Sequence, residues 1–81
     1  MTIENRTLKR PLGEWLCRWR LLRGMTQQQL ADGAGLSLWA IQHIEQGRVL
    51  DPRLGTIVRI CDTLGLTLAE LLTEPEPLEY S

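Results

Sequence analysis

The stretch MTQQQLADGAGLSLWAIQHIEQG, residues 25–47, opens with the signals of a short helix that ends in a tight turn. Thr26 and Gln29 form a T-x-x-Q capping box, in which the Thr hydroxyl accepts from a backbone N–H and the Gln side chain reaches back to the cap. Gly33 and Gly35 then disfavour continuation of the helix. The first half of the stretch therefore predicts a helix of about two turns, followed by a sharp change of direction.

After the turn, Ser37 is an N-cap candidate for a second helix over residues 38–46. Five residues of the two helices lie at offsets of 0, 4, 8, 14 and 17 from the first of them. Ala31 is small, as a close crossing of two helices requires, and Gly35 can take a positive φ. Ile41 and Ile44 fix the second helix to the core. This pattern predicts a helix-turn-helix, whose second helix enters the DNA major groove; the five residues are Gln27, Ala31, Gly35, Ile41 and Ile44.

On the N-terminal side, residues 1–10 show no sustained periodicity and are expected to form a flexible basic arm. Pro11 suits the first turn of a helix, because its fixed φ is helical. Apolar side chains at three- and four-residue spacing then predict an amphipathic helix that ends at Gly24. This apolar stripe consists of Leu12, Trp15, Leu16, Trp19 and Leu22.

On the C-terminal side, Asp51 and Pro52 form an N-cap and first-turn pair, which predicts a fourth helix that ends at Gly65. Thr67 and Glu70 form a second capping box and predict a short fifth helix. The apolar positions of the fourth helix are Leu54, Ile57, Val58, Ile60, Cys61 and Leu64.

Pro75 and Pro77 exclude further helix, so residues 74–81 are expected to form an acidic tail. No segment alternates with period two, and no hairpin turn of the Asn-Gly or Asp-Gly type is present. The sequence therefore predicts an all-α fold of five helices, with one helix-turn-helix domain over residues 11–73.

The charge of the chain is unevenly distributed. The 81 residues have a formal net charge of −1, which by itself argues against nucleic acid as a partner. Residues 1–59, however, contain all nine basic residues and five acidic ones, a formal charge of +4, whereas residues 60–81 contain five acidic residues and no basic one. The predicted helix-turn-helix lies inside the basic part, so the composition is compatible with DNA binding.

Several functional classes are disfavoured by what the sequence lacks. No apolar run approaches the length of a bilayer span, and no signal-peptide layout is present, so we expect a cytoplasmic protein with no membrane partner. His43 is the only histidine, and Cys17 and Cys61 have no zinc-ligand spacing, so no metal or other cofactor is expected. The sequence contains no catalytic constellation or phosphate-binding loop, which disfavours an enzyme with a small-molecule substrate.

The helical segments together resemble the Cro/C1-type helix-turn-helix family, also called the XRE family, of bacterial and phage regulators. The resemblance extends from Leu12 to Leu72 and retains the family's order of elements. It implies a five-helix, lambda-repressor-like fold and a sequence-specific transcriptional regulator that binds double-stranded DNA. The segments that carry it are LxxWR-LLRG-MTQQQLA, GLSLWAIQHIEQGR and DPRLGTIVRICDTLGLTLAELL.

The resemblance also implies roles for individual residues. Arg20 and Glu45 match a structural ion pair between the first and third helices, and both are therefore left out of the site. The resemblance implies that side chains at the N-terminus of the second helix bind a DNA phosphate. The backbone N–H groups of that N-terminus would add to this binding. The base-contact positions are Leu38, Trp39, Gln42 and His43, and the phosphate-contact positions are Gln27, Gln28, Arg48 and Arg53.

Leu38 and Trp39 depart from the family, which usually has polar side chains at these positions. Neither can form the bidentate hydrogen bonds by which Arg or Gln discriminates bases, although both can contact a thymine methyl group. Gln42 can pair with adenine, and His43 can donate to guanine or to a phosphate. An exposed Leu-Trp pair also suits a protein partner, so a protein-interaction module, such as an antitoxin or a regulator's partner subunit, is the alternative.

A homodimer is expected, because one short recognition helix reads only a few base pairs. By resemblance, the expected dimer surface is the region around the fifth helix together with the tail segment that contains Leu78 and Tyr80.

Overall fold

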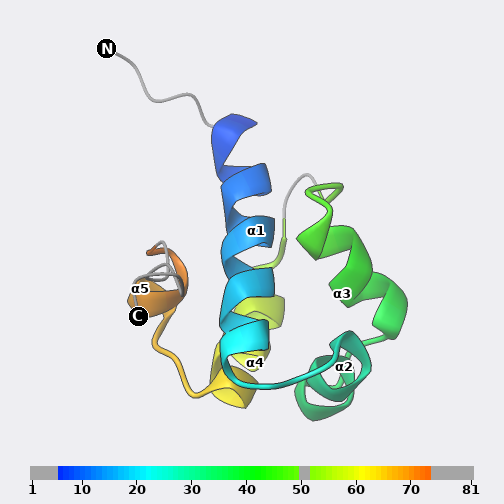
Figure 1. Cartoon of the computed structure of the whole chain (residues 1–81). Helices are drawn as coiled ribbons and strands as arrows, with labels where there is room; N and C mark the ends of the chain where they lie inside the picture. Colours follow the sequence, from blue (N-terminus) through cyan, green and yellow to red (C-terminus); the bar gives the residue numbers. More distant parts are fainter. Residues whose placement is uncertain (1–5, 50–51, 74–81) are drawn as a thin grey trace.

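The computed structural model describes residues 6–49 and 52–73, and within these ranges the chain forms five α-helices and no strand. This confirms the prediction of an all-α fold. The helices are α1 (Arg6–Leu22), α2 (Gln27–Ala34), α3 (Leu38–Glu45), α4 (Leu54–Leu64) and α5 (Leu68–Leu71), as Figure 1 shows.

The predicted caps of α2, α3 and α5 are present. The hydroxyl of Thr26 accepts from the Gln29 N–H at 3.0 Å, while the Gln29 side-chain oxygen accepts from the Thr26 N–H at 2.8 Å. Thr67 and Glu70 form the same box at the start of α5, and Ser37 caps α3 through the Ala40 N–H. These local hydrogen bonds satisfy backbone donors that a helix N-terminus leaves without partners.

Gly35 forms the turn between α2 and α3 with the left-handed conformation expected of it. Its φ is 69° and its ψ is 33°, a region that costs a residue with a Cβ atom about 1 kcal/mol. Its N–H donates to the Asp32 carbonyl, and the Leu36 N–H donates to the Ala31 carbonyl at 2.9 Å. The turn thus closes α2 and leads into α3 within three residues.

Two helix starts differ from the prediction. Helix α1 begins at Arg6 and contains Pro11, whose fixed φ is helical but which has no N–H to donate to the carbonyl four residues earlier. The arm expected over residues 1–10 therefore overlaps the start of α1, and residues 1–5, like the tail 74–81, lie outside the described residues.

Helix α4 begins at Leu54, not at the predicted Asp51-Pro52 pair. Arg53 is its N-cap, with an extended backbone (φ −69°, ψ 143°) and no side-chain capping bond. The first helical hydrogen bond runs from the Ile57 N–H to the Arg53 carbonyl at 3.1 Å. Asp51 lies outside the described residues.

The core is an apolar cluster to which all five helices contribute. Trp19 is half-buried and packs against it, as predicted, and Cys61 is buried within it. Leu54 and Val58, by contrast, are 65% and 42% exposed, so α4 buries a narrower stripe than its sequence contains. The buried apolar residues are Leu16, Leu30, Ala31, Ala34, Ile41, Ile44, Ile57, Ile60, Cys61, Leu64, Leu66 and Leu71.

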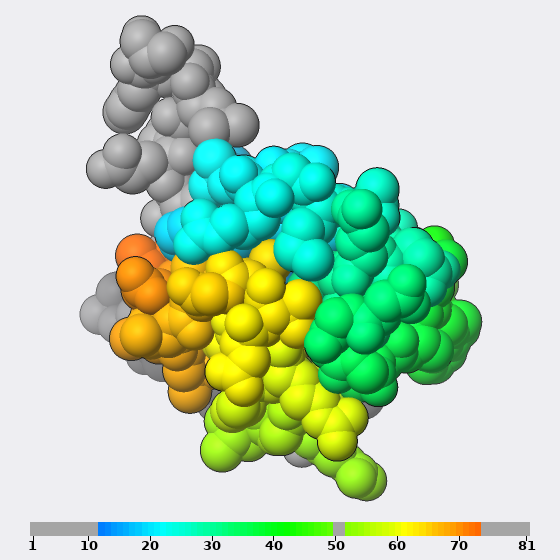
Figure 2. Space-filling model, turned by 90° about the horizontal axis from the view of Figure 1, so that it is seen from below, coloured from blue at the N-terminus to red at the C-terminus, as the bar shows by residue number. Residues whose placement is uncertain are grey.

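The helices are arranged so that one side of α3 is free. Helix α1 packs against α3 on one side and against α5 on the other (Figure 1). Seen from below, α4 lies between α5 and the green atoms of α2 and α3 (Figure 2). Helices α1 and α2 both pack against α3 and hold its buried side, which leaves its opposite side available to a partner.

Candidate nucleic-acid interface

Helix α3 has a buried face and an accessible face. Ile41 and Ile44 are 0% and 5% exposed and anchor the helix to the core. Because an α-helix has 3.6 residues per turn, positions 38, 39, 42 and 43 lie together on the opposite face. Trp39 is 64% exposed, and the other three residues are partly exposed. The structure therefore brings together the four residues predicted to contact bases: Leu38, Trp39, Gln42 and His43.

Trp39 and His43 are stacked, one helical turn apart. Their ring centroids are 3.9 Å apart, and the ring planes are inclined by 31°. His43 Nδ1 lies 3.0 Å from the Trp39 carbonyl oxygen. Since a carbonyl oxygen only accepts, this contact is a hydrogen bond when Nδ1 carries the proton. The imidazole is thus held at two points, by the indole ring and by the backbone.

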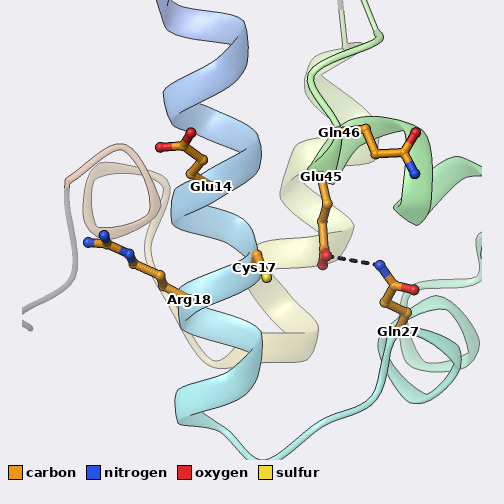
Figure 3. A pocket seen from close by; sticks show the side chains of 6 residues that line it. All are labelled: Glu14, Cys17, Arg18, Gln27, Glu45 and Gln46. Carbon is orange, nitrogen blue, oxygen red and sulfur yellow. Dashed lines mark hydrogen bonds between the residues drawn. The ribbon is translucent and has the colours of Figure 1, made fainter. Parts of the chain in front are cut away.

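Gln27 lies at the start of α2, where the prediction of a phosphate contact placed it, but its side chain is not free. Its amide nitrogen donates to Glu45 Oε1 at 3.0 Å and so links α2 to the end of α3. Figure 3 shows Gln27, Glu45 and Cys17 facing one another from three different helices. The amide retains a second N–H, which is the group available to a phosphate. The neighbouring Gln28 is exposed and donates to Asp32 Oδ1 at 2.8 Å.

The expected Arg20–Glu45 ion pair is confirmed. Arg20 donates from Nε to Glu45 Oε2 at 2.7 Å and from a terminal nitrogen to Oε1 at 3.1 Å. The other terminal nitrogen donates to the Met25 carbonyl at 2.9 Å. The two charged side chains are only 10% and 6% exposed. The hydrogen bond with Glu45 raises the pKa of Arg20 further above its usual value, so the guanidinium remains charged.

Arg20, Glu45 and Gln27 therefore form one network, and Cys17 borders it. The Cys17 sulfur lies 3.5 Å from an Arg20 nitrogen. Burial, with a further contribution from the Glu45 carboxylate, raises the pKa of the Cys17 thiol, and burial does the same for Cys61. Both thiols therefore remain protonated at neutral pH, which disfavours a nucleophilic role.

A hollow of about 400 Å³ opens between α1, α2 and α3 beside this network. Two carboxylates line this hollow, that of Glu14 on α1 and that of Glu45 on α3. Within the described residues, no group of three His, Cys, Asp or Glu side chains is placed to hold a metal ion. The residues that line it are Glu14, Cys17, Arg18, Gln27, Glu45 and Gln46 (Figure 3).

Arg48 and Arg53 are both exposed and lie in the connection between α3 and α4, Arg48 shortly after α3 and Arg53 directly before α4. The Arg48 N–H donates to the His43 carbonyl at 2.9 Å, which places Arg48 directly after the accessible face of α3. Arg53 is the N-cap of α4, where the positive end of the helix dipole adds to its own charge. Two exposed cations thus lie in the connection that follows α3.

A second, mainly apolar hollow of about 290 Å³ lies between α3 and the start of α4. No sequence pattern predicts this hollow, because its walls come from residues up to twenty positions apart with no common spacing. Trp39 forms one of its walls, so the exposed indole lies between this hollow and His43. The lining residues are Leu36, Trp39, Ala40, Ile44, Val49, Pro52, Arg53 and Thr56.

Taken together, α2, the Gly35 turn and α3 define a helix-turn-helix, with its second helix accessible on one face. A family model described as helix-turn-helix matches residues 18–71. The chain belongs to the Cro/C1-type (XRE) helix-turn-helix family, a non-enzymatic class of DNA-binding transcriptional regulators.

Among curated proteins, the chain is similar to the HTH-type transcriptional regulator PuuR of Escherichia coli (strain K12), with 36% identity over 64 residues. The PuuR of Shigella flexneri is similar to the same extent. The match covers 79% of this chain but only 34% of the relative, so the chain spans about a third of the length of these regulators.

Two solved structures share the fold, each with more than a quarter of the aligned residues identical. The clp gene regulator ClgR from Corynebacterium glutamicum has a TM-score of 0.77 at 28% identity, covering 83% of this chain and 86% of that one. The restriction-modification controller protein C.AhdI from Aeromonas hydrophila has a TM-score of 0.74 at 26% identity, covering 76% and 92%. These likenesses confirm the lambda-repressor-like arrangement of the five helices. Within the described residues, no helix is both long and apolar enough to span a membrane.

Proposed function

We propose that the protein binds specific DNA sequences as a transcriptional regulator and inserts α3 into the major groove. The observation that carries this proposal is the accessible face of α3, which lies opposite the buried Ile41 and Ile44. A helix anchored in this way can enter a groove without losing its contacts to the core. Gln42 and His43 supply its hydrogen-bonding groups, while Leu38 and Trp39 supply apolar contacts.

Phosphate contacts would hold α3 in register. The N-terminus of α2 presents backbone N–H groups and the Gln27 amide, which Glu45 keeps in place. Gln28 lies next to it, and Arg48 and Arg53 lie in the connection that follows α3. The proposed phosphate contacts thus come from the start of α2 and from the segment after α3, and the base-reading face lies on α3 itself.

Replacing Arg48 or Arg53 by alanine is expected to weaken binding to all DNA sequences by a similar factor. Each loses a phosphate contact, so the slope of log K against log salt should become shallower by about one for each arginine. Fluorescence anisotropy titrations of a labelled duplex at several salt concentrations measure both effects. Arg59→Ala is the matched control, since Arg59 is also an exposed arginine but belongs to α4, which supplies none of the proposed phosphate contacts. Equal salt slopes for all three variants and the unaltered protein would contradict the assignment.

We further propose that two copies assemble through a surface around α5. Leu68 and Leu72, one helical turn apart, are 38% and 50% exposed, so α5 has an uncovered apolar face. A two-fold dimer would place two copies of α3 about 34 Å apart, one turn of DNA. The tail residues Leu78 and Tyr80, which were expected to contribute, lie outside the described residues.

Leu72→Glu is expected to convert the dimer to a monomer, because it places a charge in the proposed interface. Leu54→Glu is the matched control, since Leu54 is 65% exposed at the far end of α4. Sedimentation velocity at several protein concentrations distinguishes the two states. A monomeric unaltered protein, or a dimer that survives Leu72→Glu, would contradict this surface.

A protein-binding function is the alternative, and the apolar hollow beside Trp39 is the observation that favours it. Trp39→Ala separates the two functions. If the protein binds DNA through α3, this change weakens DNA binding. If Trp39 instead anchors a protein partner, the change abolishes that association and leaves DNA affinity as it was.

A further inference from the structure

Trp39 and His43 form a preassembled pair on the accessible face of α3. The centroid distance of 3.9 Å means that the two rings are in contact, and the bond from Nδ1 to the Trp39 carbonyl restricts rotation of the imidazole. Stacked aromatic pairs contribute about 0.5–1.5 kcal/mol beyond the area they bury. Trp39 remains 64% exposed in this arrangement, so the pair projects from the helix and is not part of the core.

The backbone contact determines which hydrogen-bonding group the imidazole offers to a partner. The Trp39 carbonyl requires a proton on Nδ1, and a neutral imidazole with its proton on Nδ1 has a lone pair on Nε2. The imidazole of His43 makes no other hydrogen bond within the described residues. Its Nε2 is therefore an acceptor that is available to a ligand.

In the major groove, only two of the four bases offer a donor to such an acceptor. Adenine presents its N6 amino group and cytosine its N4 amino group, whereas guanine presents two acceptors and thymine an acceptor and a methyl group. The neutral imidazole held by Trp39 thus matches an amino-bearing base and leaves guanine and thymine without a partner for their acceptors. This differs from the expectation that His43 donates to guanine.

We propose that Trp39 and His43 act as one base-reading unit, in which Trp39 positions the imidazole so that His43 Nε2 accepts a hydrogen bond from the amino group of adenine or cytosine. The inference rests on the proposed insertion of α3 into the major groove. Trp39 is a positioning residue here, since it acts through the orientation and protonated nitrogen of His43. Leu38 cannot replace this function, because it has no hydrogen-bonding group.

The test is a selection of bound duplexes from random DNA at pH 8, with the unaltered protein and the variants His43→Ala, Trp39→Ala and Trp39→Phe. One position of the selected site should depend on His43, and the predicted donor is the amino-bearing base of that pair, adenine or cytosine, on whichever strand it lies. His43→Ala and Trp39→Ala should both abolish the preference at that position while the rest of the site is retained. Trp39→Phe keeps an aromatic ring over the imidazole and should restore most of it.

Removal of a single amino group from the DNA provides a second readout. Replacing the selected adenine by purine, or the cytosine by 2-pyrimidinone, removes only the amino group and should weaken binding about five- to tenfold. The His43→Ala variant should bind the altered and unaltered duplexes equally. Thermal melting of each variant, followed by circular dichroism, checks that the substitutions at Trp39 and His43 leave the fold unchanged.

Three results would overturn the inference: unchanged binding when the amino group is removed from the base pair that His43 controls, effects of the two variants at different positions, or full sensitivity of His43→Ala to loss of the amino group. Each of these leaves a selected site and hence the proposed function intact. Failure of the unaltered protein to enrich any sequence would instead reject the proposed function, and this inference with it.

Discussion

Gly13→Ala is expected to destabilise the domain by about 3 kcal/mol. Gly13 lies where α1 crosses the end of α3, and a Cβ atom built on it would lie 2.4 Å from the Ile44 carbonyl oxygen and 2.7 Å from that of Glu45. Both atoms belong to the backbone, so no side-chain rotation can relieve the overlap. The helices would have to separate, which would disturb the packing around Ile44. Urea unfolding followed by tryptophan fluorescence gives the change in free energy.

Gly55→Ala is the matched control for this prediction. Gly55 is also helical, but a Cβ atom there meets nothing within 4 Å. The substitution removes backbone freedom from the unfolded chain and should raise the stability by about 0.5–1 kcal/mol. The two variants should therefore shift the unfolding midpoint in opposite directions. A Gly13→Ala protein as stable as the unaltered one would show that α1 and α3 are not this close.

Arg20→Met is expected to have a comparable or larger effect, a loss of about 3–5 kcal/mol. The methionine fills much of the same space but leaves the Glu45 carboxylate, which is 6% exposed, without its cationic partner, while the neutral Gln27 amide remains. It also removes the donor to the Met25 carbonyl, which ties the end of α1 to the start of α2. Thermal and urea unfolding monitored by circular dichroism measure the loss.

Two further variants show whether the loss comes from the stranded carboxylate. The double variant Arg20→Met, Glu45→Leu removes both charges and should recover a large part of the stability, since well-packed apolar residues often replace a buried ion pair with little cost. Arg59→Met on the exposed side of α4 should change the stability by no more than about 0.5 kcal/mol. If Arg20→Met is no more harmful than Arg59→Met, the network does not hold the three helices together.

The sequence predicted the helix-turn-helix itself because its signals are local. The two capping boxes, Ser37 and the left-handed Gly35 each involve residues within four positions of one another, and all are present. The predicted starts of α1 and α4 were wrong. Pro11 and Pro52 are compatible with a helix start, but a proline does not determine whether the helix begins at it, before it or after it.

For the candidate site, the register of α3 was enough to predict which residues share its accessible face. The partners of those residues were less predictable. Gln27 and Glu45 are eighteen positions apart, and only the crossing of α2 and α3 brings them within 3.0 Å. The stacking of Trp39 on His43 follows from a spacing of four on a helix, but the protonated nitrogen of the imidazole depends on its contact with the backbone.

The claim that α3 recognises DNA bases is tested most directly by comparing two duplexes, one selected from random DNA by this protein and one with the same composition in scrambled order. Anisotropy titrations near 50 and 200 mM salt should show that both bind more weakly at higher salt. The selected duplex should bind at least about a thousandfold more tightly than the scrambled one. Absence of binding to either duplex near 50 mM salt, or equal affinity for the two, would contradict the account.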